Sequence, residues 1–93
     1  MAFTKESAVE LAKNDLAKRL NTSASEVMEL ECTDHEFRDM ALGAPENGEM
    51  AAQMISSGWQ IRLAVGSESF EYRADKYHVR LHNFNGANYV IQS

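Results

Sequence analysis

The sequence predicts an α+β domain in which an N-terminal amphipathic helix packs on one face of a four- to five-stranded, mainly antiparallel sheet. Three observations support this fold class. Apolar residues recur at spacings of three and four near the N-terminus, side chains alternate between apolar and polar from Trp59 onward, and turn sequences separate the alternating runs. The helical pattern comes first and the strand patterns follow, which favours α+β over alternating βα units.

Residues 4–20 have the pattern of an amphipathic helix. Its apolar stripe is formed by Ala8, Val9, Ala12, Leu16 and Leu20. Thr4 is the expected N-cap, and Glu6 lies in the first turn, where the helix dipole favours a negative charge. Lys18 and Arg19 occupy the last turn, the end that favours cations.

Residues 23–37 predict a helical turn followed by a strand. Ser23 and Glu26 have the spacing of a capping box, which indicates a short turn over 24–27. Met28, Leu30 and Cys32 then alternate with polar residues. This period of two predicts a strand with one solvated face, extending as far as Phe37.

The second half of the chain predicts a hairpin and two further strands. Residues 59–65 and 70–74 alternate, and the sequence GSES at 66–69 is typical of the turn between them. A third alternating run covers 77–82, and NFNG at 83–86 contains an Asn-Gly pair typical of tight turns. A last short strand is expected at 89–91. We expect Ile61, Leu63 and Tyr72 to point inward against the helix.

Length and composition limit the possible functions. The 93 residues form one domain, residues 1–93, and the net charge of −5 argues against partners such as nucleic acid or an anionic membrane surface. Cys32 is the only cysteine, so no internal disulfide is possible. The chain shows no signal peptide and no apolar run of membrane-spanning length, so the expected location is cytoplasmic.

No motif indicates catalysis, a cofactor or a metal, so we expect a non-enzymatic protein. His78 and His82 would lie about 13 Å apart along a strand, too far to share one ion, and we interpret them as polar residues on a solvated face beside Arg80. The carboxylates are interpreted as a solvated acidic edge: Asp34, Glu36, Asp39, Glu46 and Glu49. Only a polar pocket that held His35, Asp39 and Ser57 together would favour an enzyme.

The stretch Ala41–Met50 is the candidate interaction loop. Gly43 and Gly48 permit positive φ and Pro45 fixes the backbone between them, so the loop is either an architectural turn or a recognition element. The candidate site residues are Leu42, Gly43, Ala44, Pro45, Glu46, Asn47, Gly48, Met50 and Trp59. The expected partner is another protein or a second copy, bound through an exposed sheet edge or an apolar patch near Met50, Met54 and Trp59.

Four segments in order resemble a small bacterial domain family without an established activity: DLAKRL, SASEV, FRDMALGAP and SSGWQIRLAVGSESFEYRAD. That family has a DLAxRLGV helix, a WPDxSLGCP-type loop and a YEYHTD-type strand, and the resemblance covers roughly residues 15–81. The family's loop cysteine corresponds to Ala44 and its Trp-Pro to Phe37 and Arg38, while Asp39 is retained. The resemblance implies an α+β fold, and the missing cysteine fits a reducing compartment.

A second resemblance suggests the alternative function. The stretch YRADKYHVRL is similar to a strand of small bacterial serine-protease inhibitors related to potato inhibitor I. Such an inhibitor presents a rigid, convex loop that enters the protease cleft in an extended form. Residues 41–50 are the one long loop available for that purpose.

Overall fold

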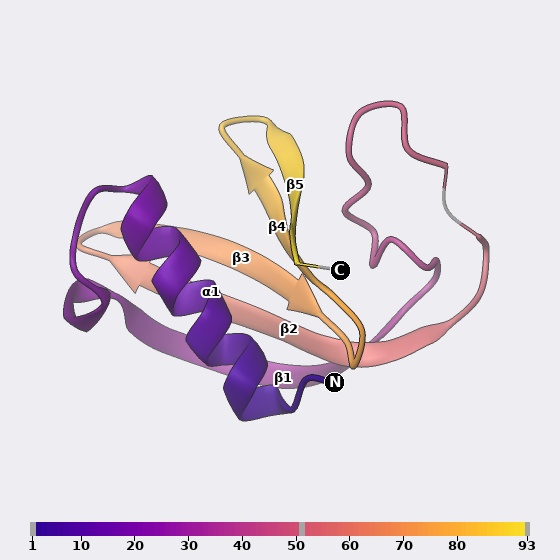
Figure 1. Cartoon of the computed structure of the whole chain (residues 1–93), viewed down its shortest axis with the longest axis horizontal. Coiled ribbons are helices and arrows are strands. Elements are labelled where there is room, and N and C mark those ends of the chain that lie inside the picture. The colour runs from indigo at the N-terminus through magenta and orange to yellow at the C-terminus, as the bar shows by residue number, and fades with distance from the viewer. Residues whose placement is uncertain (1, 51, 93) are drawn as a thin grey trace.

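The computed structural model describes residues 2–50 and 52–92 and has the predicted α+β fold (Figure 1). Its helices are α1 (Lys5–Arg19) and the short 3-10 helix η1 (Ala24–Glu26). Its strands are β1 (Met28–Phe37), β2 (Ser56–Val65), β3 (Glu68–Ala74), β4 (Val79–Phe84) and β5 (Ala87–Gln92). They form one sheet in the order β1-β2-β3-β4-β5, and each strand is antiparallel to its neighbour.

The helix begins where the sequence indicates. The Thr4 hydroxyl accepts a hydrogen bond from the Ser7 amide at 3.1 Å, and the Ser7 hydroxyl accepts one from the Thr4 amide at 2.8 Å. This reciprocal capping box satisfies two amides that the helix itself leaves free. The buried side chains of α1 are Ala8, Val9, Ala12, Leu16 and Ala17, which confirms most of the predicted stripe.

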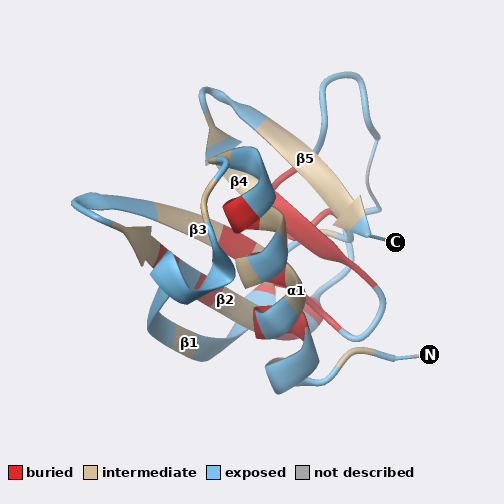
Figure 2. Cartoon of the chain, turned by 60° about the vertical axis from the view of Figure 1, so that its left-hand side comes forward, coloured by how far each residue is buried: buried red, intermediate tan, exposed pale blue. Residues whose placement is uncertain are grey.

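The core lies between α1 and the sheet. The inward-facing side chains of β2, β3 and β4 are fully buried, and they are Ile61, Leu63, Tyr72, Ala74, Val79 and Leu81. Figure 2 shows this buried layer beneath α1. Cross-strand pairing places Tyr72 opposite both Ile61 and Leu81, and burial of each large apolar side chain contributes about 1.5–3 kcal/mol. The predicted inward face of the hairpin is therefore confirmed.

Several predicted boundaries differ from the structure: β3 begins at Glu68 and β5 covers Ala87–Gln92, each longer than predicted. Strand β2 begins at Ser56, three residues before the predicted start. Tyr77 is 72% exposed, because the Asp75 carboxylate accepts hydrogen bonds from the Tyr77 and His78 amides and holds this segment in a turn. Strand β4 continues to Phe84, and the β4–β5 turn is made by Asn85 and Gly86, both at positive φ. The capping box predicted at Ser23 is also absent, because Ser23 makes no capping hydrogen bond to η1.

The prediction of one solvated face on β1 was wrong, because the strand contains a β-bulge. Glu29 pairs with Leu63 and Glu31 with Arg62, so Leu30 has no partner residue and the alternation changes phase there. Met28 and Leu30 are 65% and 53% exposed instead of buried under α1. Strand β1 is thus an edge strand with solvent on both faces over most of its length.

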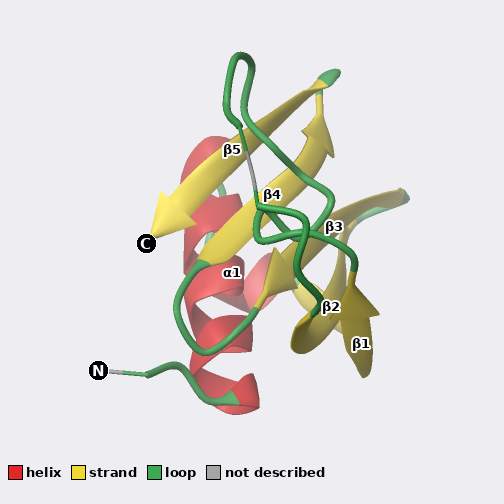
Figure 3. Ribbon diagram, turned by 90° about the vertical axis from the view of Figure 1, so that its right-hand side faces the viewer, coloured by secondary structure: helices red, strands yellow, loops and turns green. Residues whose placement is uncertain are grey.

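The interpretation of a solvated face beside Arg80 was also wrong. The loop that follows β1 crosses the sheet on the side away from α1 (Figure 3). Its residues Ala41, Leu42 and Ala44 are buried. His78 and Arg80 are consequently only 8% and 6% exposed.

Candidate functional site

The first half of the candidate interaction loop is packed onto the sheet. Leu42 and Ala44 are fully buried, so neither side chain is available to a partner. The Asp39 carboxylate accepts hydrogen bonds from the amides of Ala41 and Gly43, both at 2.9 Å. Gly43 takes a φ of 68°, a conformation that glycine adopts without strain. These residues form an architectural turn.

Two arginines of the sheet hold the loop backbone. Arg73 Nη1 donates to the Leu42 carbonyl at 3.0 Å, and Arg80 Nη1 donates to the Ala44 carbonyl at 3.2 Å. The two arginines are cross-strand neighbours, so their charges repel each other. Carboxylates compensate each charge, because Glu71 pairs with Arg73 at 2.6 Å and Glu49 pairs with Arg80.

The second half of the loop, 45–50, forms an exposed tip. The amide of Glu49 donates to the Glu46 carbonyl at 2.9 Å, and Gly48 provides the positive φ of 83° that this turn needs. Met50 at the end of the tip is 97% exposed. Pro45, Asn47 and Gly48 are exposed as well.

The tip also covers part of the outer edge of β5. The Glu46 carboxylate accepts a hydrogen bond from the Val90 amide at 3.1 Å. Asn88 Nδ2 donates to the Pro45 carbonyl at 2.9 Å. An amide of the last strand is therefore already paired within the chain.

Trp59 lies apart from the loop, on the α1 side of the sheet. It is half-buried, pairs with Asp34 on one side and Ala74 on the other, and packs against the core. An open groove of about 690 Å³ adjoins it, lined by Asp34, His35, Glu36, Ser57, Gly58, Trp59 and Lys76. The nine candidate residues thus belong to two separate places, the loop and the groove.

The groove does not bring together the three residues that would favour an enzyme. His35 and Ser57 line it, but Asp39 does not. The Asp39 carboxylate is bound to loop amides, and the His35 ring packs on Phe37 at a centroid distance of 4.6 Å. Among the residues that the structure describes, no group of three or more His, Cys, Asp or Glu side chains is arranged to hold a metal ion.

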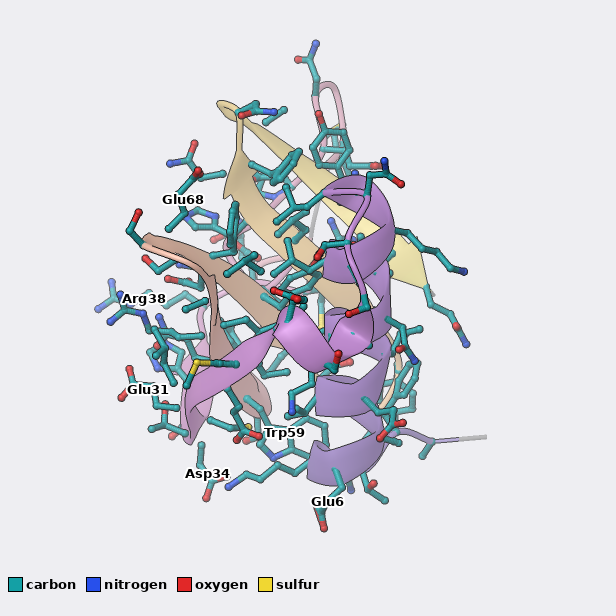
Figure 4. All side chains as sticks on the ribbon, turned by 90° about the vertical axis from the view of Figure 1, so that its left-hand side faces the viewer. Glu6, Glu31, Asp34, Arg38, Trp59 and Glu68 are labelled. Carbon is teal, nitrogen blue, oxygen red and sulfur yellow. The ribbon has the colours of Figure 1, made fainter. Side chains whose placement is uncertain are left out.

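The free edge of β1 is a site that the sequence analysis did not locate. Hydrogen bonds from β2 satisfy one side of the strand, and every second residue turns its amide and carbonyl to the other side. From Glu31 to Phe37 the pairing with β2 is regular, so this part of the edge contains no bulge. Glu31 and Asp34 extend outward from it into solvent (Figure 4).

A signal for this edge is present in the sequence. Carboxylates occupy both even and odd positions of the strand: Glu29, Glu31, Asp34 and Glu36. A strand covered on one face carries charges mainly on the other, whereas an edge strand tolerates them on both. The acidic edge predicted from composition therefore corresponds, for Asp34 and Glu36, to β1, while Asp39, Glu46 and Glu49 belong to the loop.

Comparison with known proteins gives one match. The model of a family described as a domain of unknown function (DUF8738) matches residues 9–82. No curated protein and no solved structure matches the chain. Within the described residues, no helix has the length and apolar character needed to cross a membrane.

Proposed function

The chain belongs to the DUF8738 family of domains of unknown function, and we propose that it is a non-enzymatic interaction module that binds an extended segment of another protein along the free edge of β1. Binding of this kind adds a strand to an existing sheet, and main-chain hydrogen bonds provide the affinity. We also propose that the protein is bacterial and cytoplasmic, as the sequence suggested.

The contrast between the two sheet edges carries the proposal. At β5, the Glu46 carboxylate binds the Val90 amide and Asn88 binds the loop backbone. At β1, the described residues make no such contact with the outer side of the strand. Proteins usually shorten or cover an edge that must stay unpaired, and β1 is ten residues long.

Exposed apolar side chains support the same edge. Met28 and Leu30 lie on β1 and are more than half exposed, and the groove beside Trp59 opens next to Asp34 and Glu36. An added strand gains affinity from its backbone and specificity from pockets that receive alternate side chains. Strand β1 offers both a free backbone edge and apolar surface beside it that can receive side chains.

The fixed roles of the reactive groups support a non-enzymatic protein. Asp39, Glu49 and Glu71 each bind a loop amide or an arginine that holds the fold together. Burial raises the pKa of the Cys32 thiol, and the nearby Lys5 opposes this only in part. A thiol with a raised pKa is a poor nucleophile near neutral pH.

The loop geometry does not favour the serine-protease inhibitor alternative. Residues 41–44 are held against the sheet, and the remaining tip is a tight turn, whereas an inhibitor loop enters its protease in an extended form. That alternative remains a prediction that depends on 45–50 alone. We expect no inhibition of a panel of serine proteases at micromolar concentrations.

Amide hydrogen exchange tests the proposal. Binders are selected from a random library of ten-residue peptides, and exchange is measured on the whole chain with and without the best binder. We expect slower exchange in β1 and unchanged exchange in β5 and in the tip. Slower exchange centred on 45–50, with β1 unaffected, would overturn the proposal and revive the loop as the binding site.

A further inference from the structure

Resting on the proposed function, we infer that the segment bound by β1 is a basic strand of a different protein, with a lysine or arginine side chain in the groove beside Trp59. The charges along the edge, the repulsion between two copies of it and the composition of the groove all point to such a partner.

Strand β1 carries four carboxylates and no lysine or arginine. Two of the carboxylates have cationic neighbours on the inner side, because Lys5 lies 3.4 Å from Asp34 and Arg62 lies 3.7 Å from Glu31. Both pairs are solvent-exposed and therefore weak. Glu29 and Glu36 form no salt bridge with any described residue.

A second copy of the chain is a poor partner for this edge. In an antiparallel pair, directly opposite side chains share a face of the sheet, so two copies of the regular stretch Glu31–Phe37 pair odd residues with odd and even with even. A pairing centred on Asp34 places Asp34 of one copy opposite Asp34 of the other. In any register, two β1 edges bring together eight carboxylates and no lysine or arginine, and like charges across a strand pair are destabilising. The same carboxylates favour a basic strand, and Asp34 and Glu36, which share a face, favour lysine or arginine at alternate residues.

The groove provides a place for one long basic side chain. Its lining includes the carboxylates of Asp34 and Glu36 and a single ammonium group, that of Lys76. Lys5 already pairs with Asp34 at 3.4 Å, whereas Glu36 has no salt bridge to a described residue, so Glu36 is the carboxylate that an additional cation would meet. The Trp59 indole adjoins these carboxylates, and an indole ring attracts a cation over its face.

Charge reversal of the bound peptide tests the inference separately from the proposed function. We expect the peptides selected on β1 to be enriched in lysine and arginine at alternate positions. Replacing these residues with glutamate in the best peptide should weaken binding at least tenfold in low salt, and about 0.5 M salt should reduce that difference. Equal affinity of the two peptides would overturn the basic partner, whereas the proposed function would stand as long as exchange in β1 still slows.

Two further measurements complete the test. Trp59 is the only tryptophan, so its fluorescence reports occupation of the groove directly. We expect the emission to change on binding, and the double variant Glu31→Gln/Glu36→Gln to bind the basic peptide several-fold more weakly. The control Glu26→Gln/Glu68→Gln removes two exposed carboxylates outside β1 and should bind as the unmodified chain does. Equal loss in both double variants would reduce the effect to net charge and overturn the assignment to β1.

Discussion

Glu49 and Arg80 form a two-point ion pair that joins the loop after β1 to the sheet face opposite α1. Arg80 Nη1 lies 2.5 Å from Glu49 Oε1, and Arg80 Nη2 lies 2.7 Å from Oε2. The arginine side chain is only 7% exposed. The guanidinium therefore has little water around it, and its charge depends on the carboxylate and on the Ala44 carbonyl.

Removal of the carboxylate should destabilise the fold. We expect Glu49→Ala to lower the free energy of unfolding by about 2–3 kcal/mol, because it leaves a buried guanidinium without its partner. Urea denaturation followed by tryptophan fluorescence measures the change. The matched control is Glu31→Ala, which removes the exposed partner of Arg62 and should cost no more than about 1 kcal/mol. Equal losses in the two variants would show that the ion pair contributes no more than a surface contact.

The same pair predicts how stability depends on pH. The hydrogen bond from Arg80, assisted by the Glu46 amide, lowers the pKa of Glu49 to about 2 in the folded chain. A carboxyl with a lower pKa in the folded state stabilises the fold above its unfolded pKa, and that contribution is lost as pH falls from about 4.5 to about 2. The hydrogen bond and charge of Arg73 also lower the pKa of Glu71, outweighing the opposing effect of burial.

Acid titration of the unfolding free energy tests this contribution. We expect the unmodified chain to lose stability over that interval and Glu49→Gln to show a shallower dependence there. Glu71 should keep part of the slope in the variant, because its pKa shift has the same sign. Glu26→Gln, which changes an exposed residue of η1, should reproduce the original profile. Identical slopes for Glu49→Gln and the unmodified chain would contradict the assigned role of Glu49.

The sequence predicts the α1 side of the fold well because that side follows from local patterns. The spacing from Ala8 to Leu16 and the alternation from Ile61 to Tyr72 each identify a buried face without reference to distant residues. Both faces are buried as expected. The capping role of Thr4 is equally local, since its partner Ser7 is three residues away.

The opposite side could not be predicted in the same way. Arg80 alternates with buried Val79 and Leu81, and alternation alone does not distinguish a polar face in water from one covered by a loop. The covering contacts are non-local, since Glu49 and Ala44 lie 31 and 36 residues before Arg80. The candidate loop was identified from its glycines and proline. Its burial depends on hydrogen bonds to Arg73 and Arg80, which are distant in the sequence.

A hydrogen bond between helix and sheet gives the next prediction. The hydroxyl of buried Tyr72 donates to Asp15 at 2.7 Å, and Arg19 donates to the same carboxylate oxygen at 2.7 Å. We expect Tyr72→Phe to lower the unfolding free energy by about 1.5–3 kcal/mol, the usual range for a hydrogen bond to a charged group. Tyr77→Phe is the control, because that side chain is 72% exposed. An unchanged free energy of unfolding in Tyr72→Phe would show that the hydroxyl makes no net contribution to stability.

Gly58 permits a close approach of two strands. A Cβ at this position would overlap the carbonyl oxygen of Ala74, which is backbone and cannot rotate away. We expect Gly58→Ala to cost more than about 2 kcal/mol, because the β2–β3 pairing must shift to admit the methyl group. Gly48→Ala is a useful comparison, since Gly48 has a positive φ but open space around it and should cost only about 1 kcal/mol. Thermal unfolding measures the two losses of stability. A larger loss in Gly48→Ala than in Gly58→Ala would refute this explanation.

The acidic residues of β1 give a prediction about assembly. Self-pairing of two β1 edges would bring together eight carboxylates and no lysine or arginine. The double variant Glu29→Lys/Glu31→Lys leaves each edge with two lysines and two carboxylates, so repulsion between the edges gives way to opposite-charged cross-strand pairs, each favourable by about 0.2–1 kcal/mol. We therefore expect the unmodified chain to sediment as a monomer of 10.4 kDa and the variant to form a dimer at high concentration.

The control for this assembly must alter net charge equally. Glu26→Lys/Glu68→Lys makes the same change outside β1 and should remain monomeric. Raised salt should weaken the dimer of the β1 variant, because its cross-strand ion pairs are exposed to solvent. If both double variants dimerise, lower net repulsion between whole molecules is the cause. If only the β1 variant dimerises, the carboxylates of β1 are what keep this free edge from pairing with a second copy.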